Sequence, residues 1–314
     1  MDPRVEAGRS LKALLARPPR FQSNHVLQVK VGILVNPHKA GSLPALDVLC
    51  KALTAHGCEF LLEEETARLT SSDGGVPAEQ FAQQVDIAAV IGGDGTMLHA
   101  FAKLMDFAKP VAGINVGRLG FLTTCQEHEL AIFAEAVATG HFTTSERTLL
   151  EVVVARSGQP PVLFYALNEI TLARGETGRL VSLHAHVDGE LLNSYRADGL
   201  IVATPTGSTA YSLSAGGPLI SPSAGVFVIT PICPHSLSQR SLVLTDQAVI
   251  ELASHENECS PMLFTVDGRD SLRIGPDARI RIRKAQRKFQ LLCLPDRTFY
   301  QALRQKLRWH GSAN

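Results

Sequence analysis

The stretch Ile87-Ala88-Ala89-Val90-Ile91-Gly92-Gly93-Asp94-Gly95-Thr96 decides the fold of the first half of this chain. Its apolar run predicts a buried strand, and the pattern of residues 97–107 predicts a helix directly after it. We expect the glycines to take positive φ and to let the backbone approach a ligand closely. Thr96 is expected to cap the helix, whose first amides attract anions. Asp-Gly also occurs in ordinary turns, but this turn has candidate phosphate-binding residues around the carboxylate of Asp94: Gly92, Gly93, Gly95 and Thr96.

The composition is that of a soluble globular protein with balanced charge. The chain has 314 residues, of which 45% are hydrophobic and 19% charged, enough for two domains of ordinary size. Thirty basic residues balance thirty acidic ones, so we expect no nucleic-acid partner. No apolar stretch reaches the roughly 18 residues that a membrane helix needs, and no membrane partner is expected. Six widely spaced cysteines and the lack of a signal peptide favour a cytoplasmic protein.

Hydrophobic periodicity divides the chain into parts of different fold class. Residues 1–28 are basic and lack an organised apolar face, which indicates a mobile N-terminal extension. Residues 29–146 alternate strand and helix patterns, which is typical of an open parallel-sheet α/β domain that binds nucleotides. Residues 147–295 consist mostly of strand patterns and predict a β-rich C-terminal domain. Residues 296–314 predict a helix that packs back on the first domain.

The expected elements follow from these patterns. In the first part we expect strands at residues 31–35, 58–62, 87–91 and 111–114, with helices around residues 46–53, 78–84, 97–107 and 130–137. The last of these helices is expected to stop at Gly140, a favourable residue just beyond a helix C-terminus. In the second part we expect strands at residues 150–155, 162–172, 180–187, 200–203, 226–230, 249–252, 263–266, 280–283 and 289–294.

The glycine turn favours phosphoryl transfer over two commoner phosphate chemistries. The chain lacks the Gly-x-x-x-x-Gly-Lys-Ser/Thr loop of Walker-type ATPases, and the turn lacks the third glycine of the dinucleotide fingerprint. What remains is a carboxylate that can accept a hydroxyl proton while backbone amides hold a phosphoryl group. Asp94 is therefore the candidate catalytic residue. His184 and His186 share a strand face without a visible third ligand, so we expect no metal held by protein ligands alone.

Two further motifs are suited to binding a nucleoside. The segment from Asp198 to Pro218 is rich in glycine and small hydroxyl residues, and Tyr211 offers a face for a base. A long surface loop would have a similar composition. Asn168-Glu169 interrupts an apolar run, and an amide beside a carboxylate can bind a base edge and a ribose diol. A polar pair on an edge strand would have the same sequence.

Together, the Gly-Gly-Asp-Gly-Thr turn, Asn168-Glu169 and the segment from Asp198 to Pro218 resemble the NAD kinase family from about residue 31 onward. The tail, with Phe299, Leu303 and Trp309, is similar to its proteobacterial branch. The resemblance implies transfer of the γ-phosphoryl group of ATP to the 2′-hydroxyl of the adenosine ribose of NAD, which gives NADP and ADP. It also implies Mg²⁺ carried on the ATP phosphates, and Asp94 as the proton acceptor.

The resemblance also implies a set of NAD-binding residues and an oligomer. Some family sites combine residues of two subunits, with the region of Asp198 reaching the neighbour's acceptor, so a homodimer or homotetramer is implied. Arg269 stands where related bacteria often have Gln. The implied NAD-binding residues are Asp94, Gly95, Phe121, Asn168, Glu169, Arg179, Arg196, Asp198, Thr209, Ala210, Tyr211, Ser212, Leu213, Ser214 and Arg269.

Two rival functions remain open at this stage. A diacylglycerol-type lipid kinase shares the glycine turn and the Asn36-Pro37 that follows the first strand. Such an enzyme needs an apolar mouth for acyl chains, whereas the segment from Thr204 to Ser214 is polar. A non-catalytic nucleotide-binding module would keep the loops but has no reason to keep Asp94 between glycines. The three motifs together favour NAD kinase over both.

Overall fold

The computed structural model describes residues 29–72, 74–118, 120–175, 178–255, 261–295 and 297–309. The N-terminal extension expected at residues 1–28 lies outside this part of the chain. No helix within the described ranges is long and apolar enough to cross a membrane.

A parallel layer forms around the strand that precedes the glycine turn. This strand, β3 (Ile87–Gly92), is buried along its whole length, as expected for a parallel strand with both faces covered. Its neighbours run parallel to it in the order β2 (Glu59–Leu62), β1 (Lys30–Val35), β3 and β4 (Val111–Asn115), and the short β5 (Cys125–Gln126) pairs with β4. The carboxyl ends of these strands therefore meet at one edge.

Helices cover both faces of this layer. On one face α2 (Ser42–Ala55) and α6 (Leu130–Thr139) bury an apolar stripe, and α6 ends at Gly140 in the left-handed conformation, as expected. On the other face α4 (Phe81–Gln84) and α5 (Asp94–Lys103) contribute Phe81 and Phe101 to a second core. The sequence pattern missed α3 (Glu64–Leu69), which has only two buried residues. Short 3₁₀ turns precede two of these helices, η1 (Ala78–Gln80) and η2 (Glu127–Glu129).

The second half contains a six-stranded sheet in which each pairing is antiparallel. Its strand order is β13 (Leu242–Thr245), β12 (Val226–Ile232), β11 (Gly199–Ala203), β8 (Glu169–Arg174), β15 (Met262–Val266) and β16 (Asp270–Ile274). One end of β11 leads into η3 (Gly207–Thr209) and α7 (Tyr211–Ser214). These two short helices and the residue between them contain residues 209–214, which we call the polar strip. The expected fold class, a parallel α/β part followed by a β-rich part, is confirmed.

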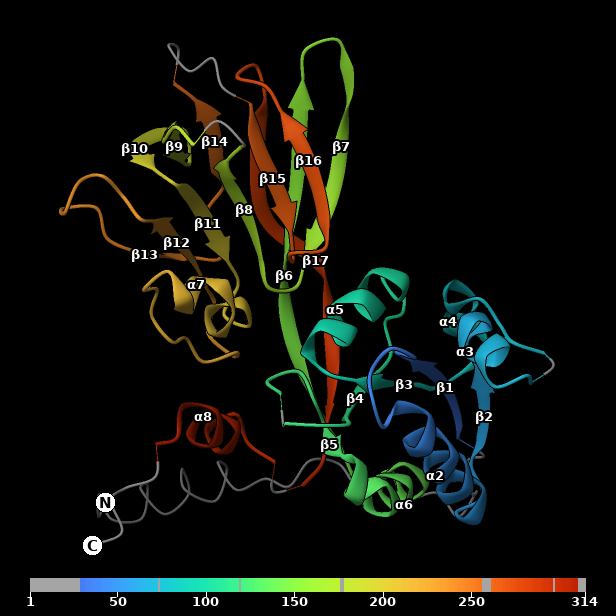
Figure 1. Ribbon diagram of the computed structural model, residues 1–314. Coiled ribbons are helices and arrows are strands. Elements are labelled where there is room, and N and C mark those ends of the chain that lie inside the picture. The colour runs from blue at the N-terminus through green and yellow to red at the C-terminus, as the bar shows by residue number, and fades with distance from the viewer. Residues whose placement is uncertain are drawn as a thin grey trace, which may run out of the picture.

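Two long strands connect the halves and place them in one sheet (Figure 1). These are β6 (Thr143–Arg156) and β17 (Arg279–Cys293), which pair with each other and extend from the parallel layer into the β-rich part. The expected boundary between residues 146 and 147 falls inside β6, which runs through it without a break. The upper part of this sheet adds β7 (Gln159–Ala166), β9 (Val181–Val187), β10 (Glu190–Ala197) and β14 (Ile250–Ser254) and packs on the six-stranded sheet.

The structure differs from the expected strands in three ways. The run at 162–172 forms two strands, β7 and β8, separated by Leu167 and Asn168. The patterns at 280–283 and 289–294 belong to the single strand β17, which is interrupted by a register shift between Lys284 and Lys288. Periodicity missed β10, β13 and β16, in which most side chains are half-exposed or exposed.

The C-terminal helix forms where the sequence predicts it. This helix, α8 (Phe299–Leu307), begins with a capping box between Thr298 and Gln301. The ring of Phe299 lies 6.1 Å from the ring of Phe121, which belongs to the segment after β4. The first turn of α8 therefore contacts the loop that surrounds the glycine turn.

Candidate active site at the carboxyl edge of the parallel sheet

Asp94 lies at the carboxyl end of β3, where it is the first residue of α5. Its Oδ2 accepts a hydrogen bond from the backbone N–H of Phe121, and its Oδ1 accepts one from Leu122, both at 3.0 Å. A Cβ atom on Gly120 would lie 1.9 Å from Oδ1, so only glycine fits beside the carboxylate. The half-buried carboxylate is thus held in one orientation by the segment of residues 120–122.

The glycines of the turn are required for close approach and not for positive φ. None of Gly92, Gly93 and Gly95 has a positive φ, so that expectation is wrong. A Cβ on Gly92 would meet Thr96 Oγ1 at 2.2 Å, and a Cβ on Gly93 would meet Lys39 Nζ at 2.5 Å. A Cβ on Gly95 would have no atom within 4 Å, so this exposed residue leaves open space at the helix start.

Thr96 does not cap α5, contrary to the expectation. The helix starts two residues earlier than Thr96, and its N-cap is Gly93. The Thr96 hydroxyl instead accepts a hydrogen bond of 3.2 Å from the side-chain amide of Asn36, which follows β1. Thr96 therefore connects the carboxyl ends of two neighbouring strands.

Lys39 is a candidate functional residue that the sequence interpretation missed. Its Nζ donates to the Gly92 carbonyl at 2.7 Å and to Asn115 Oδ1 at 3.3 Å. These partners end β3 and β4, whereas Lys39 follows β1, and such convergence is characteristic of parallel sheets. In the sequence, the neighbouring Asn36-Pro37 indicates only a similarity to lipid kinases. One sequence feature does point to Lys39: it is a lysine that follows the carboxyl end of a parallel strand by a few residues.

Asn168-Glu169 is held in a turn by buried hydrogen bonds. The carboxylate of Asp267 accepts the backbone N–H groups of Leu167, Asn168 and Glu169 at 2.9, 2.8 and 3.0 Å. The carbonyls of Leu167 and Asn168 accept hydrogen bonds from the hydroxyl and the backbone N–H of Thr204. A Cβ on Gly207 would lie 2.1 Å from the Asn168 carbonyl oxygen. These contacts place the start of the polar strip directly against Asn168.

The Glu169 side chain is buried with one oxygen that lacks a partner. The residue is 7% exposed, and its Oε2 has no hydrogen-bond partner within the described chain. Burial and, to a smaller extent, the nearby Asp267 raise the pKa of Glu169 to about 8. An orphaned buried oxygen in a polar region is the kind of feature that a bound ligand satisfies.

The polar strip at residues 209–214 presents some of its side chains and buries others. Tyr211 is 45% exposed and available for stacking. The Ser212 hydroxyl is fully buried and lies 2.9 Å from the Thr230 hydroxyl, so it supports the strip from beneath. Thr209 Oγ1 donates to the Thr206 carbonyl. Arg269 lies after Asp267, forms an ion pair with Asp270 at 2.7 Å, and has a buried Nε without a partner in the described chain.

Three of the predicted residues lie where β9 begins, where β10 ends and just before β11, at the end of β11 that is far from Thr204. Asp198 precedes β11, and the far end of that strand leads to Thr204, about 20 Å away at the usual rise per residue. Asp198 forms an ion pair with Arg174 at 3.2 Å. Arg196 is exposed on β10, and Arg179 lies two residues before β9, whose Val181 pairs with Ala197. One chain therefore does not bring Arg179, Arg196 and Asp198 to Asn168-Glu169.

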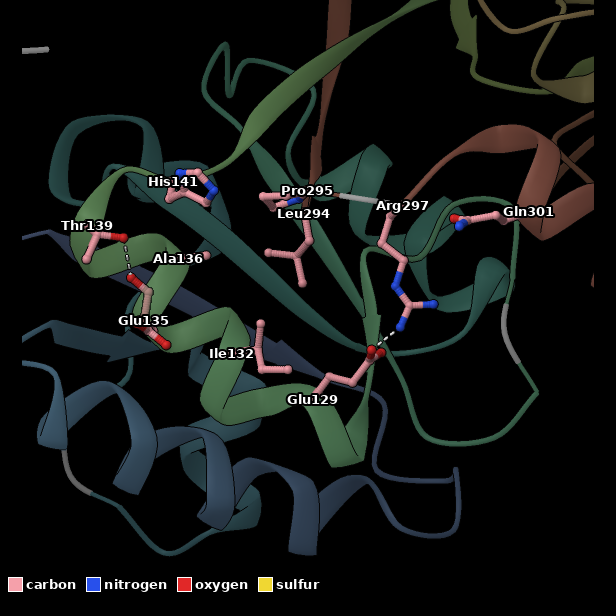
Figure 2. Close-up of a pocket in the computed structure, with 10 residues that line it drawn as sticks. All are labelled: Glu129, Ile132, Glu135, Ala136, Thr139, His141, Leu294, Pro295, Arg297 and Gln301. Atoms are coloured by element: carbon pink, nitrogen blue, oxygen red, sulfur yellow. Dashed lines mark hydrogen bonds and ion pairs between the residues drawn. The ribbon is translucent and has the colours of Figure 1, made fainter. Parts of the chain in front are cut away.

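A cavity of about 560 Å³ lies away from these residues, between α6 and residues 294–301. Figure 2 shows its lining, in which Glu129 and Arg297 form an ion pair and Thr139 donates to the Glu135 carbonyl. None of the predicted site residues lines this cavity. The candidate site is therefore the carboxyl edge of the parallel strands, not this pocket.

Two family models match the chain. Residues 31–142 match the ATP-NAD kinase N-terminal domain, and residues 167–294 match the ATP-NAD kinase C-terminal domain. The NAD kinase of Chlorobium luteolum is 40% identical over 286 residues, which cover 91% of this chain and 99% of the relative. The NAD kinase of Aeromonas salmonicida is 36% identical over 282 residues, covering 89% of this chain and 96% of the relative.

Two solved structures share the fold. Yeast NADH kinase, solved in complex with NADH, superposes with a TM-score of 0.82 at 26% identity, covering 91% of this chain and 89% of the other. An NAD kinase from Archaeoglobus fulgidus, solved in complex with ATP, superposes with a TM-score of 0.69 at 27% identity, covering 90% of this chain and 100% of the other. Together with both domain matches and the relatives, these likenesses establish that the chain belongs to the ATP-NAD kinase family.

Proposed function

We infer that this chain is an NAD kinase that transfers the γ-phosphoryl group of ATP to the 2′-hydroxyl of the adenosine ribose of NAD, giving NADP and ADP. The observation that carries the proposal is the Asp94 carboxylate, fixed at the sheet edge by the amides of Phe121 and Leu122. Family membership supports the overall reaction, and the geometry supports the roles of individual residues.

Asp94 is the proton acceptor in this proposal. An ionised carboxylate has about four lone-pair positions, and the two backbone N–H groups occupy two of them. The remaining positions are free to accept the proton of the ribose hydroxyl as it attacks phosphorus. Because the amides and Gly120 fix the carboxylate before substrate arrives, little reorganisation is needed during the reaction.

Lys39 and the first turn of α5 bind the phosphates of the donor in this proposal. The Lys39 ammonium lies beside the Gly92 carbonyl, and the exposed Gly95 leaves the helix start accessible. A cation and free N–H groups at a helix N-terminus both attract phosphate oxygens. Phosphoryl transfer depends mainly on this kind of alignment and charge stabilisation.

Mg²⁺ fits this edge only as an ion carried on the nucleotide. Both oxygens of Asp94 already accept N–H groups, and Asn115 Oδ1 accepts from Lys39, so few oxygen ligands remain at the turn. Mg²⁺ in kinases is usually held by substrate phosphates, water and one or two protein oxygens, and Asp94 and Asn115 are the oxygens near enough to assist. When bound, the ion would neutralise charge on the phosphates.

The nucleoside part of NAD lies against Asn168, Glu169 and Tyr211 in this proposal. With a raised pKa, the Glu169 carboxyl is mostly protonated near neutral pH and can donate a hydrogen bond as well as accept one. Its orphaned Oε2 would then gain a partner from the ligand. Tyr211 supplies an exposed ring for stacking on a base.

We further propose that a complete site requires two subunits. Asp198 lies about 20 Å from Thr204 along β11, too far to contact a ligand bound at Asn168-Glu169. A neighbouring subunit can supply Asp198, Arg179 and Arg196, which lie together at one end of the sheet. The homodimer is the smallest assembly that provides this.

Asp94→Asn is expected to lower kcat by about 10²- to 10⁴-fold, because an amide cannot accept the hydroxyl proton. The change is isosteric, so the midpoint of urea unfolding should stay near that of the wild type. Asp86→Asn is the matched control, because Asp86 accepts an N–H group at the opposite end of β3. Initial rates with ATP-Mg and NAD measure the effect, and near-normal turnover of Asp94→Asn would remove this residue from the mechanism.

Lys39→Met is expected to raise the KM for ATP on the order of 10- to 100-fold, because a charge-assisted contact with phosphate is lost. The KM for NAD should change little. Lys51→Met serves as the control, since Lys51 pairs with Asp47 on the outer surface of α2. Equal KM values for ATP in Lys39→Met and the wild type would contradict the assignment.

A mixed oligomer of Asp94→Asn and Asp198→Ala subunits tests the shared site. Each single variant should have low activity at subsaturating NAD, the second because it binds NAD weakly. A heterodimer contains one site with both wild-type residues, so activity should recover to about half of the wild-type value. The two variants are co-expressed with different tags and purified through both. No recovery, or a monomeric mass in solution, would show that each chain forms its own site.

Stability should fall with rising pH because of Glu169. Between the ordinary pKa of 4.5 and the folded value of about 8, the folded chain binds more protons than the unfolded chain. Unfolding free energy from urea titrations between pH 5 and 9 should therefore decrease by a few kcal/mol more in the wild type than in Glu169→Gln. Glu135→Gln, at an exposed position on α6, should follow the wild type. Parallel curves for wild type and Glu169→Gln would contradict the raised pKa.

A further inference from the structure

Arg147 is a buried cation without an ion-pair partner among the described residues. It lies on β6 opposite Phe289 of β17 and is only 6% exposed. Its Nε is inaccessible and lacks a hydrogen-bond partner, and no carboxylate among the described residues forms an ion pair with it. Burial lowers the pKa of its guanidinium, but an arginine remains charged at neutral pH. Its terminal nitrogens are not among the fully buried atoms that lack a partner, so they keep contact with the solvent, where an anion can pair with the charge.

The guanidinium of Arg147 lines a small cavity of about 70 Å³. The cavity is bounded by the segment after β4, the end of β17 and the first turns of α8, and its lining includes Gly120, Phe121, Thr123, Phe299 and Gln305. No aspartate or glutamate of the described chain lines it. The second arginine at its rim, Arg297, already forms an ion pair with Glu129 (Figure 2). The described lining residues therefore give the space a net positive charge, and that charge comes from Arg147.

The volume limits what can enter. One water molecule needs roughly 10–15 Å³ of such space, so about 70 Å³ admits a carboxylate or phosphate group but not a nucleotide. The planar guanidinium suits these groups because its N–H groups can bind two oxygens at once. The rings of Phe121 and Phe299, 6.1 Å apart, form an apolar wall at the same cavity.

The cavity shares one segment with the active site. Phe121 and Gly120 line it, and the N–H groups of Phe121 and Leu122 hold the Asp94 carboxylate. Neither Asn168, Glu169 nor any residue of the polar strip lines this space. Phe121 is the residue of the implied NAD-binding set that lines it, so an occupant would contact both the support of Asp94 and one wall of the expected NAD site.

We propose that this cavity binds a compact anion, through a carboxylate or phosphate group held by Arg147, and that its occupancy changes turnover through the segment of residues 120–122. The site is centred on Arg147, which is not among the residues proposed to bind ATP or NAD, and it shares only Phe121 with the implied NAD-binding set. It gives a buried positive charge a function that the kinase reaction does not require.

The test measures the thermal unfolding midpoint of the full chain against sodium acetate and sodium phosphate, with sodium chloride at equal ionic strength. The wild type should gain on the order of a few °C at saturation with at least one anion. Arg147→Met should lose that gain. In chloride alone its midpoint should equal or exceed that of the wild type, since an apolar side chain replaces an unpaired charge. Arg281→Met, on the exposed face of β17, should respond as the wild type does.

Comparing acetate with phosphate shows which site an anion occupies, and a second variant keeps the test valid if the first does not fold. Phosphate can also bind the glycine turn, so a gain in the unfolding midpoint that phosphate still gives in Arg147→Met is assigned to that turn. The gain that acetate gives in the wild type should be absent in Arg147→Met. Arg147→Lys keeps the charge but not the planar fork and should show a reduced gain even if the Met variant does not fold. The anion that stabilises the wild type should change its kcat at least about twofold, in line with a modest coupling energy.

Several results would overturn the proposal. These are the absence of any anion response in the wild type, equal responses in the wild type and Arg147→Met, or an unchanged kcat at saturating anion. A large loss of stability of Arg147→Met in chloride would mean that Arg147 has a structural partner, and this would also overturn it.

Discussion

The two hydrogen bonds from the backbone of Phe121 and Leu122 to Asp94 are the constraint on which the active site depends. They connect the carboxyl end of β3 with the segment after β4, and they fix a carboxylate that would otherwise rotate in solvent. Gly120 makes this possible because any side chain there would collide with Oδ1. The contact of Phe121 with Phe299 then carries the constraint to α8. The orientation of one side chain thus depends on three segments that are distant in sequence.

Much of this arrangement follows from local patterns in the sequence. The apolar run before Gly92 and the Asn168-Glu169 pair lie where strands end, so periodicity and turn chemistry were enough to find them. The contacts of Lys39, Asp267 and Arg147 could not be predicted in this way. Asp267 acts on Asn168 across 99 residues, and Arg147 is notable only because no partner reaches it. Such properties depend on which strands become neighbours, and short-range patterns do not contain that information.

The same limit explains the errors about individual residues. A Gly-Gly-Asp-Gly-Thr sequence suggests positive φ and a threonine cap, since both are common in turns. The chain instead begins α5 at Asp94, and the Thr96 hydroxyl accepts from Asn36 on the neighbouring strand end. Gly92 and Gly93 are then needed because the side chains of Thr96 and Lys39 occupy the space where a Cβ atom would lie. Contacts at the sheet edge therefore outweigh the local preference for positive φ and for a threonine cap. At this edge the residues that follow neighbouring parallel strands lie close together.

The two buried carboxylates of the second half show how geometry assigns a proton. Burial raises the pKa of both Asp267 and Glu169, and the charge of each opposes ionisation of the other. Asp267 accepts three backbone N–H groups and lies near Arg269, which both favour its charged form, whereas Glu169 Oε2 has no donor in the described chain. The proton therefore belongs on Glu169, and Asp267 remains the anion that shapes the turn. A neutral Glu169 costs little to bury and keeps both a donor and an acceptor for a ribose or a base. The carboxylate that organises the backbone and the carboxyl group proposed to bind the nucleoside are thus different residues, so the turn keeps its charged acceptor while Glu169 titrates.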